Sequence, residues 1–324
     1  MRQFALEGGS IVRRHTPAVL MSALAATLCA AGLAAQRGAP ADPLVRENVT
    51  VKVADHTYVI PDGNVGLVPN VGIVVGSRAT LVIDPGLGRR NGETVLKEVA
   101  KVSRNQATFI ASTHFHPEHT TGYVAFPASA TYINSNVQEA EFEASGMQMV
   151  RTFAGRSPLT AEMLKDAARR PADVTFDREY TLDLGGVRVR FVVVGPTHTR
   201  GDTGLFVEGD AVLFSGDVVM NESFLAAGPA SSMAAWLRAF DTFAAMAPKT
   251  IVPSHGAVGP GAIIGVNREI MEGVRARVVA LKAQGKPIDE VASTVQAEFS
   301  AQHPGWPRAT GLSAAARSAF DEAK

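Results

Sequence analysis

The sequence predicts an α/β fold, and three observations support that class. Short runs rich in valine, isoleucine and threonine, split by Asp-Gly and Gly-Ser turns, are typical of an antiparallel sheet. They lie at residues 49–53, 57–60, 71–75 and 80–83. An amphipathic helix at 91–103 and a strand at 107–112 follow, so the chain passes from strand to helix to strand. Histidines cluster directly after this last strand, and open α/β sheets place their sites at strand ends.

The later segments continue the alternation. Helices are predicted within 135–170 and at 233–246, 270–284 and 288–299, because apolar residues recur there at helical spacing. Strands are predicted at 130–133, 180–182, 187–189, 191–194, 205–207, 211–214 and 251–253. A Gly-Gly turn at 185–186 indicates a hairpin.

Composition limits the class of protein. The chain has 324 residues, a formal net charge of zero and 46% hydrophobic residues, which fits a globular enzyme with one large core or two modest ones. No basic run is present, so we expect no nucleic-acid partner. The expected partner is a small-molecule substrate, and composition does not indicate an oligomeric state.

The N-terminus predicts export. Residues 1–35 combine a charged start, an apolar alanine-rich run from Pro17 to Ala35, and small residues at its end, the pattern of a secretory signal segment. A membrane span is the alternative, but the run is barely long enough and poor in large apolar side chains. Cys29, the only cysteine, lies inside this run. We expect a periplasmic or secreted protein, without stable membrane association after the signal is removed, that begins with a linker at 36–48.

The densest chemical signal is the stretch His114-Phe-His116-Pro117-Glu118-His119. In an extended segment the side chains at i and i+2 point the same way, so His114 and His116 can face one ion. Proline ends the ladder, and the turn can aim Glu118 and His119 at a second point nearby. Imidazole suits zinc, and carboxylate is an acceptable partner for it. The stretch therefore predicts a metal site at the rim of the sheet.

This stretch resembles the signature H-x-H-x-D-H of the metallo-β-lactamase-fold hydrolases, with Glu118 in the place of the usual aspartate. That family needs three further ligands later in the chain. Pro-Thr-His198-Thr, Ser-Gly-Asp217 and Ser-His255-Gly supply them in the required order and at matching spacing. Taken singly, His198 and Asp217 are ordinary loop residues, and only the joint pattern makes them candidate ligands. The resemblance covers roughly residues 50–260.

The resemblance implies a four-layer αββα sandwich, with two sheets packed face to face between two layers of helices. We expect this domain at 49–261, followed by a C-terminal helical extension at 262–324 that packs on the core. The extension contains no ligand-like residues. His303 and Trp306 are interpreted as packing residues, with the edge of a pocket as the alternative.

The resemblance also implies the roles of individual residues. The ligands of one zinc are expected to be His114, His116 and His198, and those of the other Glu118, His119 and His255. Asp217 is expected to bridge the two metals. Asp84, which ends the strand at 80–83, looks like the aspartate that supports the family's metal site from behind its ligands; the alternative is an ordinary turn aspartate. Zinc-bound hydroxide then cleaves an ester, lactone, thioester or β-lactam type bond, with Glu118 and Asp217 as the catalytic carboxylates.

Glu118 is the departure from the family pattern. Glutamate is one methylene longer than aspartate, so the charge is kept while the carboxylate moves by over an ångström. Three outcomes follow: a shifted dinuclear site, a weak second metal, or a different preferred metal such as iron or manganese. We expect two zinc ions per chain, with lower affinity at the second site.

Residues 135–170 differ in composition and predict two helices joined by a loop near 155–158. In the family an insertion here often borders the active site. Met147, Met149 and Phe153 are therefore candidate residues of a substrate pocket or lid. The alternative is simple packing of these helices on the sheet.

The substrate and the class of function have alternatives. An aspartate at 217 argues against a typical β-lactamase and favours the branch that includes glyoxalase II-like thioesterases and lactonases. An exported protein rarely meets glutathione thioesters, which favours lactones, esters or β-lactams. Two other functions fit the resemblance. One is an accessory protein of a periplasmic quinoprotein or sulfur-oxidation system, and the other is a metal-binding protein with weak or no catalysis.

Overall fold

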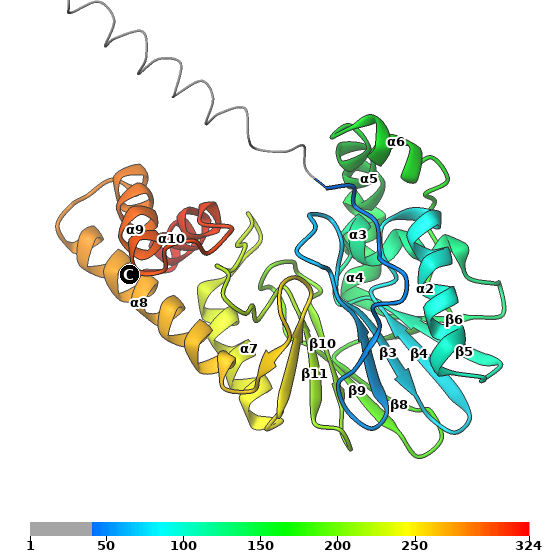
Figure 1. Ribbon diagram of the computed structural model, residues 1–324. Coiled ribbons are helices and arrows are strands. Elements are labelled where there is room, and N and C mark those ends of the chain that lie inside the picture. The colour runs from blue at the N-terminus through cyan, green and yellow to red at the C-terminus, as the bar shows by residue number, and fades with distance from the viewer. Residues whose placement is uncertain (1–40, 324) are drawn as a thin grey trace, which may run out of the picture. The chain divides into compact units, whose positions relative to one another are not determined.

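The computed structural model describes residues 41–323, and two β-sheets lie at its centre (Figure 1). The first sheet has seven strands in the order β1-β2-β3-β4-β5-β6-β7. Neighbours are antiparallel from β1 to β4 and parallel from β4 to β7. The strands are β1 (Val51–Lys52), β2 (Thr57–Ile60), β3 (Val71–Val75), β4 (Ala79–Ile83), β5 (Ala107–Ala111), β6 (Thr131–Ser135) and β7 (Val174–Phe176).

The second sheet has six strands in the order β13-β12-β11-β10-β9-β8. These are β8 (Glu179–Asp183), β9 (Arg188–Val193), β10 (Thr203–Val207), β11 (Val212–Gly216), β12 (Thr250–Pro253) and β13 (Gly259–Pro260). Both β9 and β11 are antiparallel to β10, and β12 is parallel to β11. The carboxyl ends of β9, β11 and β12 therefore lie at the same edge of the sheet.

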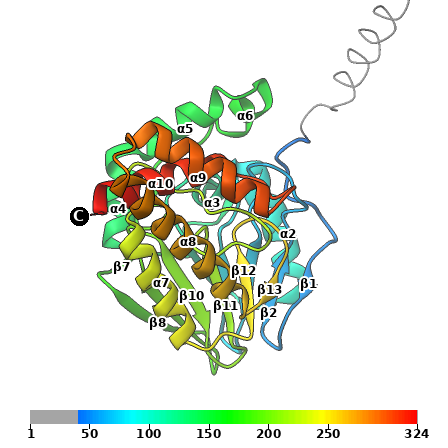
Figure 2. The same ribbon diagram turned by 90° about the vertical axis from the view of Figure 1, so that its left-hand side faces the viewer.

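Helices cover the outer face of each sheet (Figure 2). On the first sheet, α2 (Gly88–Val102) buries Val95 and Val99 against strand residues such as Ile73. On the second, α7 (Met233–Ala245) and α8 (Ile263–Ala283) pack against Leu213 and other apolar residues. A third apolar cluster, which contains Leu81 and Phe214, joins the inner faces of the two sheets. The predicted four-layer αββα sandwich is confirmed.

The C-terminal helices share a core with the second sheet. After α8 come α9 (Ile288–Gln302) and α10 (Thr310–Glu322), and Val278, Val295 and Leu312 are buried in the same cluster as Trp236 of α7. The predicted helical extension is thus present. The sequence pattern underestimated α8, which begins seven residues before Ile270, and α10 falls within the stretch expected to be helical although its own bounds were not predicted.

The segment between β6 and β7 is more broken than the two predicted helices. It contains α4 (Asn136–Glu141), a π-helical turn η2 (Phe142–Gly146), α5 (Met147–Ala154) and α6 (Pro158–Met163). A Cβ at Gly146 would lie 2.6 Å from the Phe142 ring, so this turn requires glycine. Ser157 caps α6 by accepting a hydrogen bond from Thr160 N at 3.1 Å, and Pro158 begins the helix.

The N-terminal predictions fall largely beyond the described part of the chain. The predicted secretory segment at 1–35 lies outside it, as does the first part of the linker at 36–48. The rest of that linker packs on α2, where Val45 N donates to Asn91 Oδ1 at 3.0 Å and Val45 is buried. Among residues 41–323, no helix combines the length and apolar character that crossing a bilayer requires.

Candidate metal centre

The candidate ligands all follow strands that end at neighbouring sheet edges. His114 and His116 come directly after β5, and His198 lies in the loop between β9 and β10. Asp217 follows β11, and His255 follows β12. Because the carboxyl ends of β9, β11 and β12 lie at one edge, residues far apart in the sequence meet there.

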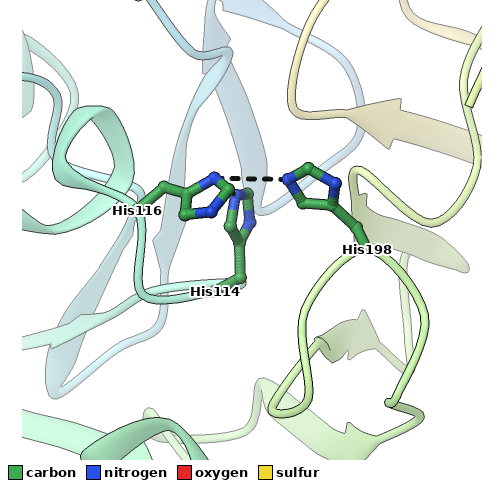
Figure 3. A group of neighbouring side chains, drawn as sticks. All are labelled: His114, His116 and His198. Atoms are coloured by element: carbon green, nitrogen blue, oxygen red, sulfur yellow. Dashed lines mark hydrogen bonds between the residues drawn. The ribbon is translucent and has the colours of Figure 1, made fainter. Parts of the chain in front are cut away.

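The first triad is His114, His116 and His198 (Figure 3). His116 Nδ1 lies 3.1 Å from His114 Nε2 and 3.2 Å from His198 Nε2. A tetrahedral zinc with Zn–N bonds of 2.0–2.1 Å needs ligand nitrogens roughly 3.3 Å apart. These two distances match one zinc ion, and all three ligand atoms lie within 4.8 Å of one another.

The second triad is Glu118, His119 and His255, whose ligand atoms lie within 4.8 Å of one another. Pro117 begins a short helix, α3 (Pro117–Thr120), which carries Glu118 and His119. The Glu118 Oε1 atom lies 3.9 Å from His119 Nε2. The imidazole centroids of His114 and His119 are 4.1 Å apart, so the two triads are immediate neighbours.

The remaining ring nitrogens of three histidines are held by acceptors behind the site. His119 Nδ1 donates to Asp84 Oδ2 at 3.0 Å. His255 Nδ1 donates to the carbonyl of Val68 at 2.9 Å, and His198 Nδ1 to that of Ala226 at 2.5 Å. Metal-binding histidines characteristically donate their other N–H in this way, which fixes the tautomer and the ring orientation. Nε2 of each ring is therefore left to face the centre.

Asp84 is the buried hub behind the second triad. Its two carboxylate oxygens accept hydrogen bonds from Thr113 N at 2.7 Å and Thr113 Oγ1 at 2.8 Å, besides the one from His119. The residue follows β4 with φ +55°, a left-handed conformation that costs a non-glycine residue about 1 kcal/mol. The three hydrogen bonds to its carboxylate hold Asp84 in this conformation, with the carboxylate directed at His119.

Asp217 lies beside both triads and is buried. Its Oδ2 atom is 3.6 Å from His198 Nε2 and accepts a hydrogen bond from Arg308 Nη1 at 2.7 Å. Burial raises the pKa of this carboxyl, but Arg308 and the histidines His198, His255 and His114 outweigh it and hold the pKa well below its ordinary value. Asp217 is therefore ionised at neutral pH.

The site imposes different protonation on its histidines. Burial lowers the pKa of His114 and of His116 well below the ordinary value, and lowers the pKa of His255 to about 3. These rings are neutral, the form that binds metals. For His119, burial acts in the same direction, but the Asp84 carboxylate outweighs it and raises the pKa to about 9. Burial raises the pKa of Glu118.

Three buried atoms at the centre have no hydrogen-bond partner among the described residues: Glu118 Oε2, His119 Nε2 and Asp217 Oδ1. Each such group costs about 1–3 kcal/mol when it stays unsatisfied. Two of these atoms belong to the second triad and the third belongs to Asp217, which lies beside both triads. Divalent cations bound at the triads would give all three atoms a partner. The residues present therefore fit a pair of metal ions held by imidazole and carboxylate.

A cavity of about 1040 Å³ opens over the centre. His116, His198 and His255 line it together with Glu118 and Asp217. Of the three candidate pocket residues, Met149 and Phe153 line the cavity, each from α5. Met147 is not among the lining residues, although all three side chains belong to or pack against a satellite cluster around Leu87 and Val150.

Two basic residues of the cavity were not anticipated from the sequence. Arg308 lies in the loop between α9 and α10, and Arg156 follows α5. The loop after α9 carries turn signals, Pro304-Gly305 and Pro307, but these indicate only an interruption between helices. No periodicity or spacing indicates that the interruption returns to Asp217.

Comparison with known proteins agrees with this geometry. The sequence profile of the metallo-beta-lactamase superfamily matches residues 65–255, more than half of the chain. A search of curated protein sequences returned no match.

Several solved structures share the fold. A metallo-beta-lactamase from Pontibacter korlensis is similar over 69% of this chain and 98% of its own, at 18% identity and a TM-score of 0.56. A metallo-beta-lactamase family protein from Thermus thermophilus is similar over 82% of this chain and 93% of its own, at 18% identity and a TM-score of 0.57.

The stereoselective inverting sec-alkylsulfatase Pisa1 from Pseudomonas sp. is similar over 84% of this chain, at 14% identity and a TM-score of 0.62. This chain spans about half of the alkylsulfatase, 50% of its length. At such identities these structures establish the fold, while the profile match establishes the family. The resemblance inferred from the H-x-H-x-E-H stretch is confirmed, and the chain belongs to the metallo-beta-lactamase superfamily.

Proposed function

We propose that this protein is a metal-dependent hydrolase that holds two zinc ions per chain. The observation that carries the proposal is the set of buried, unpartnered atoms Glu118 Oε2, His119 Nε2 and Asp217 Oδ1 beside a complete histidine triad. Imidazole and carboxylate ligands of this kind suit zinc, and iron or manganese are the alternatives.

Zinc ions at the two triads would supply water of lowered pKa, about 7, and a Lewis acid for the bond to be cleaved. The chain sets the conditions for this chemistry. Asp84 orients His119, and Arg308 keeps Asp217 ionised. Glu118 and Asp217 are the catalytic carboxylates in this proposal, since each presents a free oxygen to the centre where an attacking water would be oriented.

The substrate we propose is a small molecule with an ester, lactone, thioester or β-lactam bond, as in the glyoxalase II and lactonase branch. A cavity of about 1040 Å³ suits a ligand of that size. Polar groups lie at its base, while Leu67, Met149, Phe153 and Met220 supply an apolar lining. Such a cavity would accept a substrate with an apolar body and a polar reacting group.

Sulfate esters form a second candidate class. The similarity to the sec-alkylsulfatase covers 84% of the 324 residues, about 272, and therefore extends beyond the first 261 into the C-terminal helices. The similarity to the Pontibacter metallo-beta-lactamase covers 69%. The similarity to the Thermus thermophilus protein reaches about as far, at 82%, so the shared fold, and not the coverage, is the reason to include a secondary alkyl sulfate on the substrate panel.

The proposed location is the periplasm or the medium, after removal of residues 1–35 and without lasting membrane association. Mass spectrometry of protein recovered from the periplasmic fraction tests this directly. A mature N-terminus near residue 36 supports export, and recovery of the uncleaved chain in the membrane fraction contradicts it.

The hydrolase proposal is tested on protein that begins at residue 36. Elemental analysis should give about two zinc ions per chain, and a panel of esters, lactones, thioesters, β-lactams and alkyl sulfates should include a substrate. Chelation should abolish turnover and added zinc should restore it. His116→Ala should lose metal and activity, whereas His56→Ala, at an exposed histidine away from the centre, should lose neither. Bound zinc without turnover on any compound would support a non-catalytic or accessory role instead.

Glu118→Asp tests the unusual ligand. Close to two zinc ions in both proteins would mean that glutamate serves as a ligand in place of aspartate. About one in the native protein and two in the variant would mean that Glu118 weakens the second site, and the search for substrates should then turn to mononuclear chemistry.

A further inference from the structure

Arg308 reaches the metal centre from outside the matched superfamily region, which ends at residue 255. Its Nη1 atom donates to Asp217 Oδ2 at 2.7 Å, and its side chain lines the cavity. This contact links the C-terminal extension to the Asp217 carboxylate, which lies beside both triads.

The backbone presents Arg308 in a fixed position. Pro307 O accepts a hydrogen bond from Phe224 N at 3.2 Å, and Arg308 O accepts one from Gly311 N at 2.8 Å. Trp306 packs against the Phe224 ring with centroids 5.5 Å apart. Arg308 itself has φ +65°, a left-handed conformation that costs a non-glycine residue about 1 kcal/mol. The surrounding contacts therefore hold the loop in a conformation that arginine does not favour.

The guanidinium of Arg308 has donors to spare. It has five N–H groups, and Nη1 alone has a partner within residues 41–323. The side chain is 29% exposed, so the remaining N–H groups are accessible from the cavity. A planar fork of unused donors is the arrangement that binds carboxylate, sulfate or phosphate groups.

Charge distinguishes two roles for this arginine. If Arg308 served only to neutralise Asp217, it would duplicate what two divalent cations at the triads already do. It would also be repelled by those cations, and an anion bound between them removes that repulsion. A ligand with a negative group would therefore offset the positive charge of Arg308 and the two cations, which an empty cavity leaves uncompensated.

We propose that Arg308 binds an anionic oxygen group of the substrate, a carboxylate, sulfate or phosphate, beside the bond that is cleaved. This inference rests on the proposed hydrolase function and narrows its substrates to anionic ones. The apolar body of the substrate lies against Met149, Phe153 and the other apolar side chains of the same cavity. Arg156, whose Cζ atom lies 3.7 Å from the Phe153 ring centroid, is the competing basic residue.

The first experiment measures anion binding without turnover. Zinc-loaded protein is titrated calorimetrically with acetate, sulfate and phosphate, and zinc content is measured in the same samples. The three probes separate the three anion classes. For the tightest of them, Arg308→Met should weaken binding at least tenfold while zinc content stays the same, because charge-assisted hydrogen bonds to the anion are lost.

The second experiment compares an anionic substrate with an analogue in which a neutral carboxamide replaces the anionic group. Arg308→Met should lower the ratio of their kcat/KM values at least tenfold, mainly by raising KM for the anionic compound. Arg308→Lys keeps the charge without the planar fork and should give an intermediate ratio. Arg317→Met, at an exposed position of α10 paired with Asp289, is the matched control and should change neither the binding nor the ratio.

The outcomes are distinct. Lower zinc content with equal loss for both substrates would show that Arg308 positions Asp217, and would overturn the proposal. Loss of anion binding in Arg156→Met but not in Arg308→Met would also overturn it. If no compound on the panel is hydrolysed, the proposed function fails, while the anion titrations still decide on Arg308.

Discussion

Asp84 and the candidate metal-binding histidines have different roles, because the histidines face the centre and Asp84 orients one of them. His119, His198 and His255 each direct one ring nitrogen to the centre, because the other is held by Asp84 or by a backbone carbonyl. A ligand whose ring is fixed in advance loses little rotamer freedom when a metal binds. Of the three acceptors Asp84 is the only side chain, so it can be tested by substitution.

Asp84→Asn should weaken zinc binding at the second triad about 10- to 100-fold, because the amide is a poorer acceptor for His119 Nδ1–H and carries no charge. A competitive titration against a chromogenic chelator measures this. Asp210→Asn is the matched control, since Asp210 accepts from His56 N at 2.9 Å and from Thr57 Oγ1 at 2.6 Å without contact to a ligand. Unchanged zinc affinity in Asp84→Asn would show that Asp84 does not contribute to metal binding.

His119 makes the metal-free protein sensitive to alkaline pH. Burial opposes its charged form, but Asp84 raises its pKa to about 9, against about 6.5 for a free histidine. The folded state therefore binds this proton more tightly than the unfolded state. The resulting stabilisation is complete below pH ~6.5 and is lost as the pH rises through about 9.

In metal-free protein we therefore expect Tm to fall between these pH values, and His119→Gln should remove that part of the fall. Zinc must replace the proton on Nε2, so zinc binding at pH 7 should release about one proton from His119. Calorimetric titrations in two buffers of different ionisation enthalpy count it. The exposed His56→Gln serves as control, and an unchanged proton count in His119→Gln contradicts the assignment.

At the scale of elements, helix α5 carries two methionines that sequence alone treats alike. Met149 and Met147 are two residues apart on α5, so they point to different faces. Both side chains pack partly against the cluster with Leu87 and Val150, but of the two only Met149 also lines the cavity. The π-helical turn η2 lies before both methionines and shifts the helical phase of the whole of α5, so 3.6-residue periodicity carried over from α4 does not assign these faces.

Met149→Gln should raise KM for a substrate with an apolar body about fivefold, about 1 kcal/mol, and should also lower Tm, because Met149 packs partly against the Leu87 cluster. Met147→Gln should lower Tm while leaving KM unchanged, because its side chain packs partly against the Leu87 cluster and does not line the cavity. Steady-state kinetics and thermal melts on the two variants measure this. Equal effects of the two changes on KM would place the substrate away from α5.

For the whole molecule, the sequence predicts features that follow from local patterns and motif spacing. It misses contacts that form only when a distant loop folds back onto the site. The candidate ligands match the metallo-β-lactamase signature in order and spacing, so their convergence in one site could be anticipated from that resemblance before any coordinates. Arg308 could not, since its partner Asp217 lies 91 residues earlier and the contact depends on how the loop after α9 folds back. The packing of Val45 on α2 depends in the same way on tertiary contact, because a Pro-rich segment carries no periodicity to indicate it.

The shared core predicts that the C-terminal extension and the sandwich unfold together. Leu312 of α10 is buried in the cluster that contains Trp236 of α7 and Leu213 of β11. Leu312→Ala should lower the free energy of unfolding by about 2–5 kcal/mol, as large-to-small changes in a packed core do. Because the extension shares its core with the second sheet, loss of near-UV circular dichroism and release of zinc should occur in one transition shifted to lower temperature.

Arg317→Met, exposed on the same helix, should leave the temperature of that transition unchanged. Separation into two transitions, with zinc retained after the extension melts, would show that the sandwich holds the metal centre without α10 and that Arg308 is supplied by an independently folding unit.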